Sequence, residues 1–291
     1  MTRRGPAVVV GLVGLVGLVA CGGGSPSAER ATTTAPAPAS SSSDRSTTAS
    51  TSTTTTTRPV EPRPAWLGER ELPLRPDGLG EIQPTPPELV DRRFAAVDHL
   101  PRPENDDFTV TVEPVPQEVV ARSTWSDACP VGLDELHYLT LPFTGFDGLA
   151  HTGELIVNVD AVDVVTAGFE HLYEIGFPIE EMRITRPAEL DAHPTGDGNN
   201  TGAFVCRPTV GSTNWSQHAY GLAVDINPFH NPYVRNAVVI PELASAYVDR
   251  SDHRPGMLTA EDLAGFVDGG WGWGGRWSSS KDYMHVSATG G

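Results

Sequence analysis

Lysine is nearly absent from this sequence of 291 residues: Lys281 is the only one, and the other basic residues are arginines. Acidic residues outnumber basic ones, 37 to 20, which gives a formal net charge of −17. The chain has no basic patch and no stretch in which aromatic and basic residues alternate. This composition argues against nucleic acid as a partner.

Long hydrophobic runs are also lacking. The apolar run from Ala7 to Ala20 is too short and too rich in glycine for a comfortable membrane span. It follows Arg3 and Arg4 and ends directly before Cys21, which resembles a bacterial lipoprotein signal. We therefore expect residues 1–21 to be an export signal whose cysteine carries lipid and anchors the exported, extracytoplasmic protein to the cell membrane. An ordinary cleaved signal with an incidental cysteine is the alternative.

Residues that could form a core are scarce between Gly22 and about Pro64, where Ser, Thr, Pro, Ala and Gly dominate. Such a composition predicts a disordered tether over residues 22–64. Residues 65–128 begin with many prolines and are expected to form an N-terminal arm that packs onto the core. Residues 129–291 are expected to form one catalytic domain.

Cysteine is rare, with three in the whole sequence. Apart from Cys21, the chain has Cys129 and Cys206, which can persist as a disulfide in an exported protein. Two free buried thiols are the alternative interpretation.

The remaining pattern predicts short strands mixed with a few helices, without regular βαβ alternation. The expected strands cover residues 107–112, 136–143, 153–159, 181–185, 222–226 and 283–287. The expected helices cover residues 86–94, 117–124, 162–175, 241–248 and 259–267. This order favours an α+β domain around a small, mainly antiparallel sheet with flanking helices.

Candidate metal ligands lie in two short motifs, SQHAYGLAVD at Ser216–Asp225 and DYMH at Asp282–His285. Two imidazoles, His218 and His285, and the carboxylate of Asp225 are ligands that suit zinc. They leave a fourth position for water, as in catalytic rather than structural sites. The motifs thus predict one zinc ion.

Strand alternation shows how these ligands could meet. If the chain is extended around Asp225 and His285, both can face one cleft, and Met284 and Val286 then face the core. Gly221 would supply the sharp turn that brings the first histidine back to this cleft.

The second acid of the motifs, Asp282, would face away from the cleft on a regular strand, so it can act there only if the chain bends. In the cleft it could take a proton from water, and Arg207 could stabilise the negative oxygen of a tetrahedral intermediate. Ser216 and Tyr220 are candidates for substrate binding, although Ser216 could instead cap a turn. Arg207 could also serve only in a structural salt bridge.

Other candidates have weaker support. His230 is a fallback ligand, which the existing set makes unnecessary. The tryptophans between Trp271 and Trp277 are interpreted as core and cleft wall rather than as a platform for sugars.

The pattern Ser-x-His-x-x-Gly-x-Ala-x-Asp at residues 216–225, followed by acid-x-x-His at residues 282–285, resembles the D-alanyl-D-alanine carboxypeptidase family. That family includes vancomycin-resistance D,D-dipeptidases and carboxypeptidases and phage L-alanyl-D-glutamate endopeptidases. The likeness covers about Cys129 to Val286. It implies a fold shared with D,D-peptidases and the Hedgehog signalling domain.

The resemblance also implies residue roles. His218, Asp225 and His285 would bind zinc, Asp282 would be the general base, and Arg207 would stabilise the transition state. The dipeptidases have glutamate where this chain has Asp282, whereas the similar endopeptidases use aspartate.

The expected function is therefore a zinc metallopeptidase that hydrolyses peptide bonds in peptidoglycan stem peptides by a metal-activated water. Both the D-alanyl-D-alanine carboxypeptidase and the L-alanyl-D-glutamate endopeptidase types remain open. The alternative is a catalytically silent zinc-containing module that binds cell wall or a protein.

Overall fold

The computed structural model describes residues 60–290. The predicted signal with Cys21 and the tether as far as residue 59 lie outside the described residues. Residues 60–290 contain no helix that is both long and apolar enough to cross a membrane.

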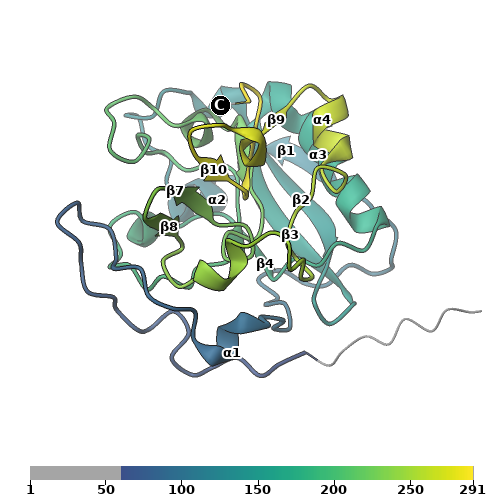
Figure 1. Ribbon diagram of the computed structural model, residues 1–291. Coiled ribbons are helices and arrows are strands. Elements are labelled where there is room, and N and C mark those ends of the chain that lie inside the picture. The colour runs from purple at the N-terminus through teal and green to yellow at the C-terminus, as the bar shows by residue number, and fades with distance from the viewer. Residues whose placement is uncertain (1–59, 291) are drawn as a thin grey trace, which may run out of the picture. The chain divides into compact units, whose positions relative to one another are not determined.

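The described chain is a mixture of short helices and mostly antiparallel strands, which confirms the α+β class (Figure 1). The helices are α1 (Pro87–Val90), α2 (Gln117–Arg122), α3 (Val162–Glu174) and α4 (Ala264–Asp268). The strands are β1 (Thr111–Pro114), β2 (Leu136–Thr144), β3 (Ala150–Asn158), β4 (Glu181–Met182), β5 (Asn200–Thr201), β6 (Ala223–Asp225), β7 (Tyr233–Arg235), β8 (Val238–Ile240), β9 (Gly272–Trp273), β10 (Lys281–Asp282) and β11 (His285–Ser287).

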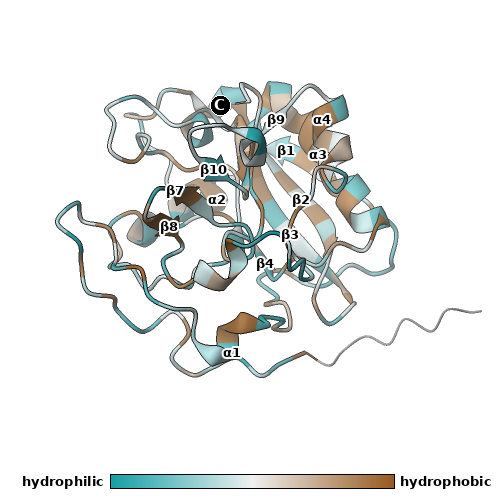
Figure 2. Ribbon diagram, in the orientation of Figure 1, coloured by the Kyte–Doolittle hydropathy of each residue, from teal (hydrophilic) through white to brown (hydrophobic). Residues whose placement is uncertain are grey.

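The longest strands, β2 and β3, form an antiparallel hairpin whose other edge pairs with β1. Because successive side chains of a strand point to opposite faces, Leu139, Leu141 and Phe143 of β2 all pack into the main core. The opposite face carries Tyr138 and Ile156 into a second apolar cluster. Both faces of the hairpin are thus covered, and Figure 2 shows the apolar residues along it.

Helix α3 packs one apolar side onto β2 and another part of its surface against α4. Its buried residues Val165, Phe169 and Leu172 have the spacing that predicted the helix. A Cβ at Gly168 would lie 2.4 Å from the Phe266 ring of α4. Glycine there permits the close approach of the two helices.

Two three-stranded sheets contain most of the candidate metal ligands and the candidate acid. One has the order β6-β11-β9, and the other has the order β10-β7-β8. The strand expected over residues 283–287 is therefore shorter: it begins at His285, while Asp282 ends a strand of the other sheet. The chain bends between these two residues.

The N-terminal arm packs onto the second half of the chain. Leu72, Leu89 and Phe94 lie fully buried in a cluster with Phe229 and Tyr247. Because this cluster joins residues more than 130 positions apart, the arm is part of the folded core.

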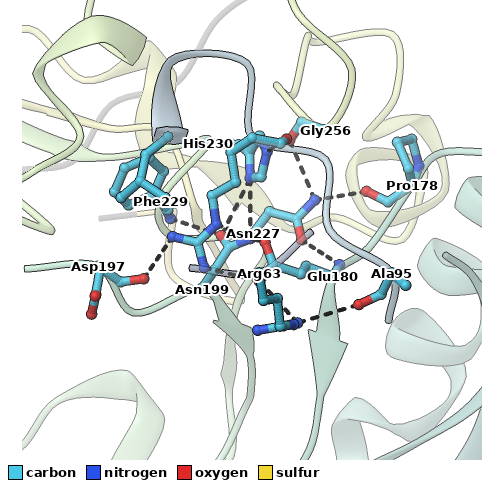
Figure 3. A network of polar contacts seen from close by, with 12 residues as sticks. Arg63, Ala95, Pro178, Glu180, Asp197, Asn199, Asn227, Phe229, His230 and Gly256 are labelled. Atoms are coloured by element: carbon cyan, nitrogen blue, oxygen red, sulfur yellow. Dashed lines mark hydrogen bonds and ion pairs between the residues drawn. The ribbon is translucent and has the colours of Figure 1, made fainter. Parts of the chain in front are cut away.

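A buried polar network lies beside this cluster (Figure 3). Arg92 donates to both carboxylate oxygens of Glu180, at 2.7 and 2.9 Å, and Arg63 contacts the same carboxylate. Asn199 donates to Glu180 at 2.8 Å and contacts the ring of His230. Each buried charge thus has a partner, as burial requires.

Several predicted elements differ from the structure in length. The helix expected over residues 241–248 is only a 3₁₀ turn at Ser245–Tyr247, and the strand expected over residues 181–185 has two residues. The hydrogen bonds between Thr259 and Asp262 form as a capping box predicts, but they close a turn before α4. Phe108 and Val110 pack on the core without pairing, so the strand expected from residue 107 starts at residue 111.

Candidate active site

His218 lies on a 3₁₀ turn, Gln217–Tyr220, that begins with a side-chain cap: the Ser216 hydroxyl accepts the His218 N–H at 3.3 Å. Gly221 ends the turn with φ of +69°, and a Cβ there would lie 2.5 Å from the backbone nitrogen of Asn158. Only glycine suits both conditions, as the sequence predicted. Nδ1 of His218 lies 2.6 Å from the Ala203 carbonyl, to which it donates. Nε2 is therefore left free to act as a ligand.

Asp225 and His285 are directly opposite each other in the antiparallel pair β6–β11. Their side chains meet with 3.1 Å between His285 Nδ1 and Asp225 Oδ1. His218 Nε2 lies 3.2 Å from both His285 Nδ1 and Asp225 Oδ2. The three residues predicted as ligands are thus brought together.

This set fits a zinc ion by its chemistry and its convergence. Each residue offers one ligand atom, and these atoms lie within 4.8 Å of one another. Burial opposes ionisation of Asp225, but His218 and His285 outweigh it and hold the pKa of this carboxyl well below its usual range. A carboxylate with two imidazoles is a ligand set that zinc takes in proteins.

Asp282 reaches the same place because of the bend before His285. Its Oδ1 is buried and has no hydrogen-bond partner among residues 60–290. Burial and the negative charge of Asp225 raise the pKa of Asp282 to about 7, although His285 and Arg207 oppose the shift. A carboxyl with this pKa can both take and return a proton near neutral pH.

Gly274 explains how the chain accommodates this acid. A Cβ at Gly274 would lie 2.6 Å from the backbone oxygen of Asp282 and 2.8 Å from its Cβ. Any side chain at this position would push Asp282 away from where it lies.

A cavity of about 480 Å³ contains Asp282 and the three candidate ligands. One wall is a single face of the sheet β10-β7-β8. Asp282 is opposite Tyr233, which is opposite Ile240, and the next row on the same face is Arg235 opposite Val238. All five side chains line the cavity. It is therefore built between two sheets, one with metal ligands and one with the acid.

Arg207 also lines this cavity, as predicted. It directly follows Cys206, and the disulfide predicted between Cys206 and Cys129 is confirmed. The backbone N–H of Cys206 also donates to the Thr124 hydroxyl at 2.9 Å. These two ties fix the backbone from which the arginine extends.

The structure does not bring every predicted residue to the cavity. Ser216 lines it while capping its turn, but Tyr220 packs into the apolar cluster next to the disulfide and is absent from the cavity wall. His230 is buried in the polar network, where its Nε2 donates to the Arg92 carbonyl, and burial lowers its pKa to about 4. Met284 is buried, as expected, and it also lines the cavity.

The tryptophans divide as the sequence suggested. Trp271 is buried in the main core, whereas Trp277 lines the cavity with its ring 5.7 Å from that of His285.

Sequence reasoning missed the hairpin β7–β8 and its cavity-facing residues. The alternating stretch YVRNAVVI is a signal that could have found it, since Asn236 adopts a positive φ of +54° in a two-residue turn. It also missed Leu79 of the arm, which lines the cavity and which no local pattern marks.

Comparison with known proteins agrees with this geometry. Residues 210–288 match the profile of a family described as D-alanyl-D-alanine carboxypeptidase, a range that includes the three candidate ligands and Asp282. No curated protein and no solved structure matches the chain. This match over residues 210–288 supports the family predicted from the two motifs: that part of the chain is similar to the D-alanyl-D-alanine carboxypeptidase family.

Proposed function

We propose that this protein is a zinc-dependent peptidase that hydrolyses peptide bonds in peptidoglycan stem peptides. The observation that carries the proposal is Asp282: a carboxyl whose Oδ1 is buried and unpartnered among residues 60–290, placed in one cavity with a three-residue ligand set. A site that only bound metal or peptide would have no need of this acid.

His218, Asp225 and His285 would hold the metal, and the bound ion would supply Lewis-acid chemistry that polarises the scissile carbonyl and makes water more acidic. The Ala203 carbonyl fixes the tautomer of His218 for this task.

Asp282 takes the proton from the attacking water and returns it to the leaving amine. Its position suits both steps, because its Oδ1 has no hydrogen-bond partner among residues 60–290 and lies in the same cavity as the ligand set. Arg207, on the same cavity wall, pairs with the negative oxygen that develops on the substrate carbonyl.

The cellular setting belongs to the same proposal: an exported lipoprotein, anchored through Cys21, that works on the wall outside the membrane. The disulfide between Cys129 and Cys206 supports an oxidising compartment. The fold would be that of D,D-peptidases and the Hedgehog signalling domain.

Incubation of the purified protein with zinc and a set of muropeptides tests the function, with new termini identified by mass spectrometry. Loss of the terminal D-alanine would show carboxypeptidase action, and a free D-glutamyl amine would show the endopeptidase type. Asp282→Asn serves as the control that should release neither product. A zinc-loaded protein that cleaves no muropeptide would instead support a silent binding module.

A further inference from the structure

The cavity has a second positive group besides Arg207. Arg235 lies at the end of β7, on the same sheet face as Tyr233 and Asp282, and its side chain lines the cavity. The alternate residues Val234 and Lys281 are paired on the opposite face. Lys281 donates to the carbonyls of Gly275 and Trp277. Of the two basic residues in this small sheet, only Arg235 faces the cavity.

Arg235 has no side-chain hydrogen bond, ion pair or ring contact with any residue from 60 to 290. Arg92, Arg122 and Arg183 each pair with glutamate. An arginine without a carboxylate partner, in a cavity beside the reacting groups, has its donors available for a ligand.

We propose that Arg235 recognises a carboxylate of the substrate and so selects anionic peptides. This inference rests on the proposed function and names the substrate feature that the same site reads. The guanidinium presents a planar set of donors that matches a carboxylate in two parallel hydrogen bonds.

The register sets how far along the strand the Arg235 backbone lies from the residue paired with Asp282. Arg235 lies two residues beyond Tyr233, which is paired with Asp282, so their backbones are about 7 Å apart along the strand. An extended peptide advances about 3.3–3.6 Å per residue, so this offset corresponds to about two substrate residues. Arg235 would therefore contact a carboxylate on a substrate residue close to the scissile bond, and not the scissile carbonyl itself.

The surroundings favour a peptide rather than a small anion. Val238, opposite Arg235, and Ile240, opposite Tyr233, give the wall an apolar strip next to the arginine. A ligand with aliphatic groups and a carboxylate matches this strip. In stem peptides two such carboxylates are available, one at the C-terminal D-alanine and one on the D-glutamyl residue.

Binding measurements can test this without relying on turnover. The probes are the pentapeptide L-Ala-γ-D-Glu-L-Lys-D-Ala-D-Ala, its C-terminal carboxamide, and the form with D-isoglutamine in place of D-glutamate. Each is titrated calorimetrically into zinc-loaded Asp282→Asn protein, with and without Arg235→Gln. Arg276→Gln is the control, because Arg276 is exposed, lies outside the cavity wall and loses the same charge.

We expect Arg235→Gln to weaken binding of the parent peptide about fivefold to tenfold, and Arg276→Gln to leave it unchanged. One of the two amidated peptides should bind the protein that retains Arg235 about fivefold to tenfold more weakly than the parent peptide does. For that amidated peptide, Arg235→Gln should cause no further loss of affinity. The amidated peptide that shows this behaviour identifies the carboxylate that Arg235 contacts. Equal weakening of all three peptides, or no weakening, would overturn the role of Arg235. If no peptide binds while Arg235 is present, the proposed substrate class itself fails.

Discussion

Removal of the disulfide should affect stability and catalysis separately. The bridge joins Cys129 and Cys206, which are 77 positions apart. Opening a loop of this size restores to the unfolded chain an entropy worth about 4–5 kcal/mol in the chain-entropy model, and about 2–5 kcal/mol is the usual range for native bridges. We therefore expect the double Cys→Ser variant to lose about 2–5 kcal/mol of unfolding free energy. Its turnover should also fall at temperatures where it is still folded, because the residue before Arg207 loses its covalent tie to Cys129.

A matched control separates the two effects. Leu89 is fully buried in the cluster that the arm forms, and Leu89→Ala should cost a similar 2–5 kcal/mol (roughly) without touching Arg207. Urea unfolding gives the stability of each variant, and stem-peptide cleavage below both unfolding transitions gives the rate. If the two variants are equally active, the disulfide stabilises the fold but does not aim the arginine.

Three further predictions concern the site and its support. His285→Ala should abolish stoichiometric zinc binding, whereas Asp282→Asn should keep the zinc and lose turnover, as measured by metal analysis after gel filtration; zinc loss in Asp282→Asn would contradict the roles assigned here. Gly274→Ala should displace Asp282, lowering kcat at least about tenfold while zinc content stays constant, and unchanged kcat would mean that the acid needs no fixed position. Burial opposes ionisation of Glu180, but Arg92 outweighs it and lowers the pKa of Glu180 below the unfolded value of 4.5. This ionised pair therefore contributes its full stabilisation at pH values above 4.5. The contribution is lost as the pH falls through the lower pKa that Glu180 has in the folded protein. Urea unfolding should show Glu180→Gln about 3–5 kcal/mol less stable than the natural protein at pH 7, with the difference shrinking toward pH 3; a constant difference would refute the linkage.

The ligand set could be predicted because each motif is short and its local geometry is constrained. His218 and Asp225 are seven positions apart, with a glycine between them that only a tight turn requires. Alternation along two strands then places Asp225 opposite His285. Such local rules need no knowledge of the rest of the fold.

The position of Asp282 could not be predicted in the same way. Nothing in the stretch DYMH shows that its first residue pairs with β7 while its last pairs with β6. That division depends on partners about 50–60 positions earlier in the chain, which a period-two pattern does not reveal. The cavity-facing side of Met284 was missed for the same reason.

The arm shows a different limit of sequence reasoning. Leu79 lines the cavity from a segment outside the matched range of residues 210–288. It is held there by contacts of its neighbour Gly80, whose N–H donates to Glu242 at 2.9 Å. Glu242 lies 162 positions after Gly80, so only the folded structure reveals this contact.

The bend at residues 283–284 lets two different sheets contribute residues to the cavity. The sheet β6-β11-β9 carries Asp225 and His285, while the sheet β10-β7-β8 carries Asp282 and the row that ends in Arg235. Changes in the β7–β8 hairpin can therefore alter which peptides fit without disturbing the metal ligands. Natural variation in specificity within such a domain should concentrate in that hairpin, and grafting it between relatives offers a way to exchange substrate preference while metal affinity is retained.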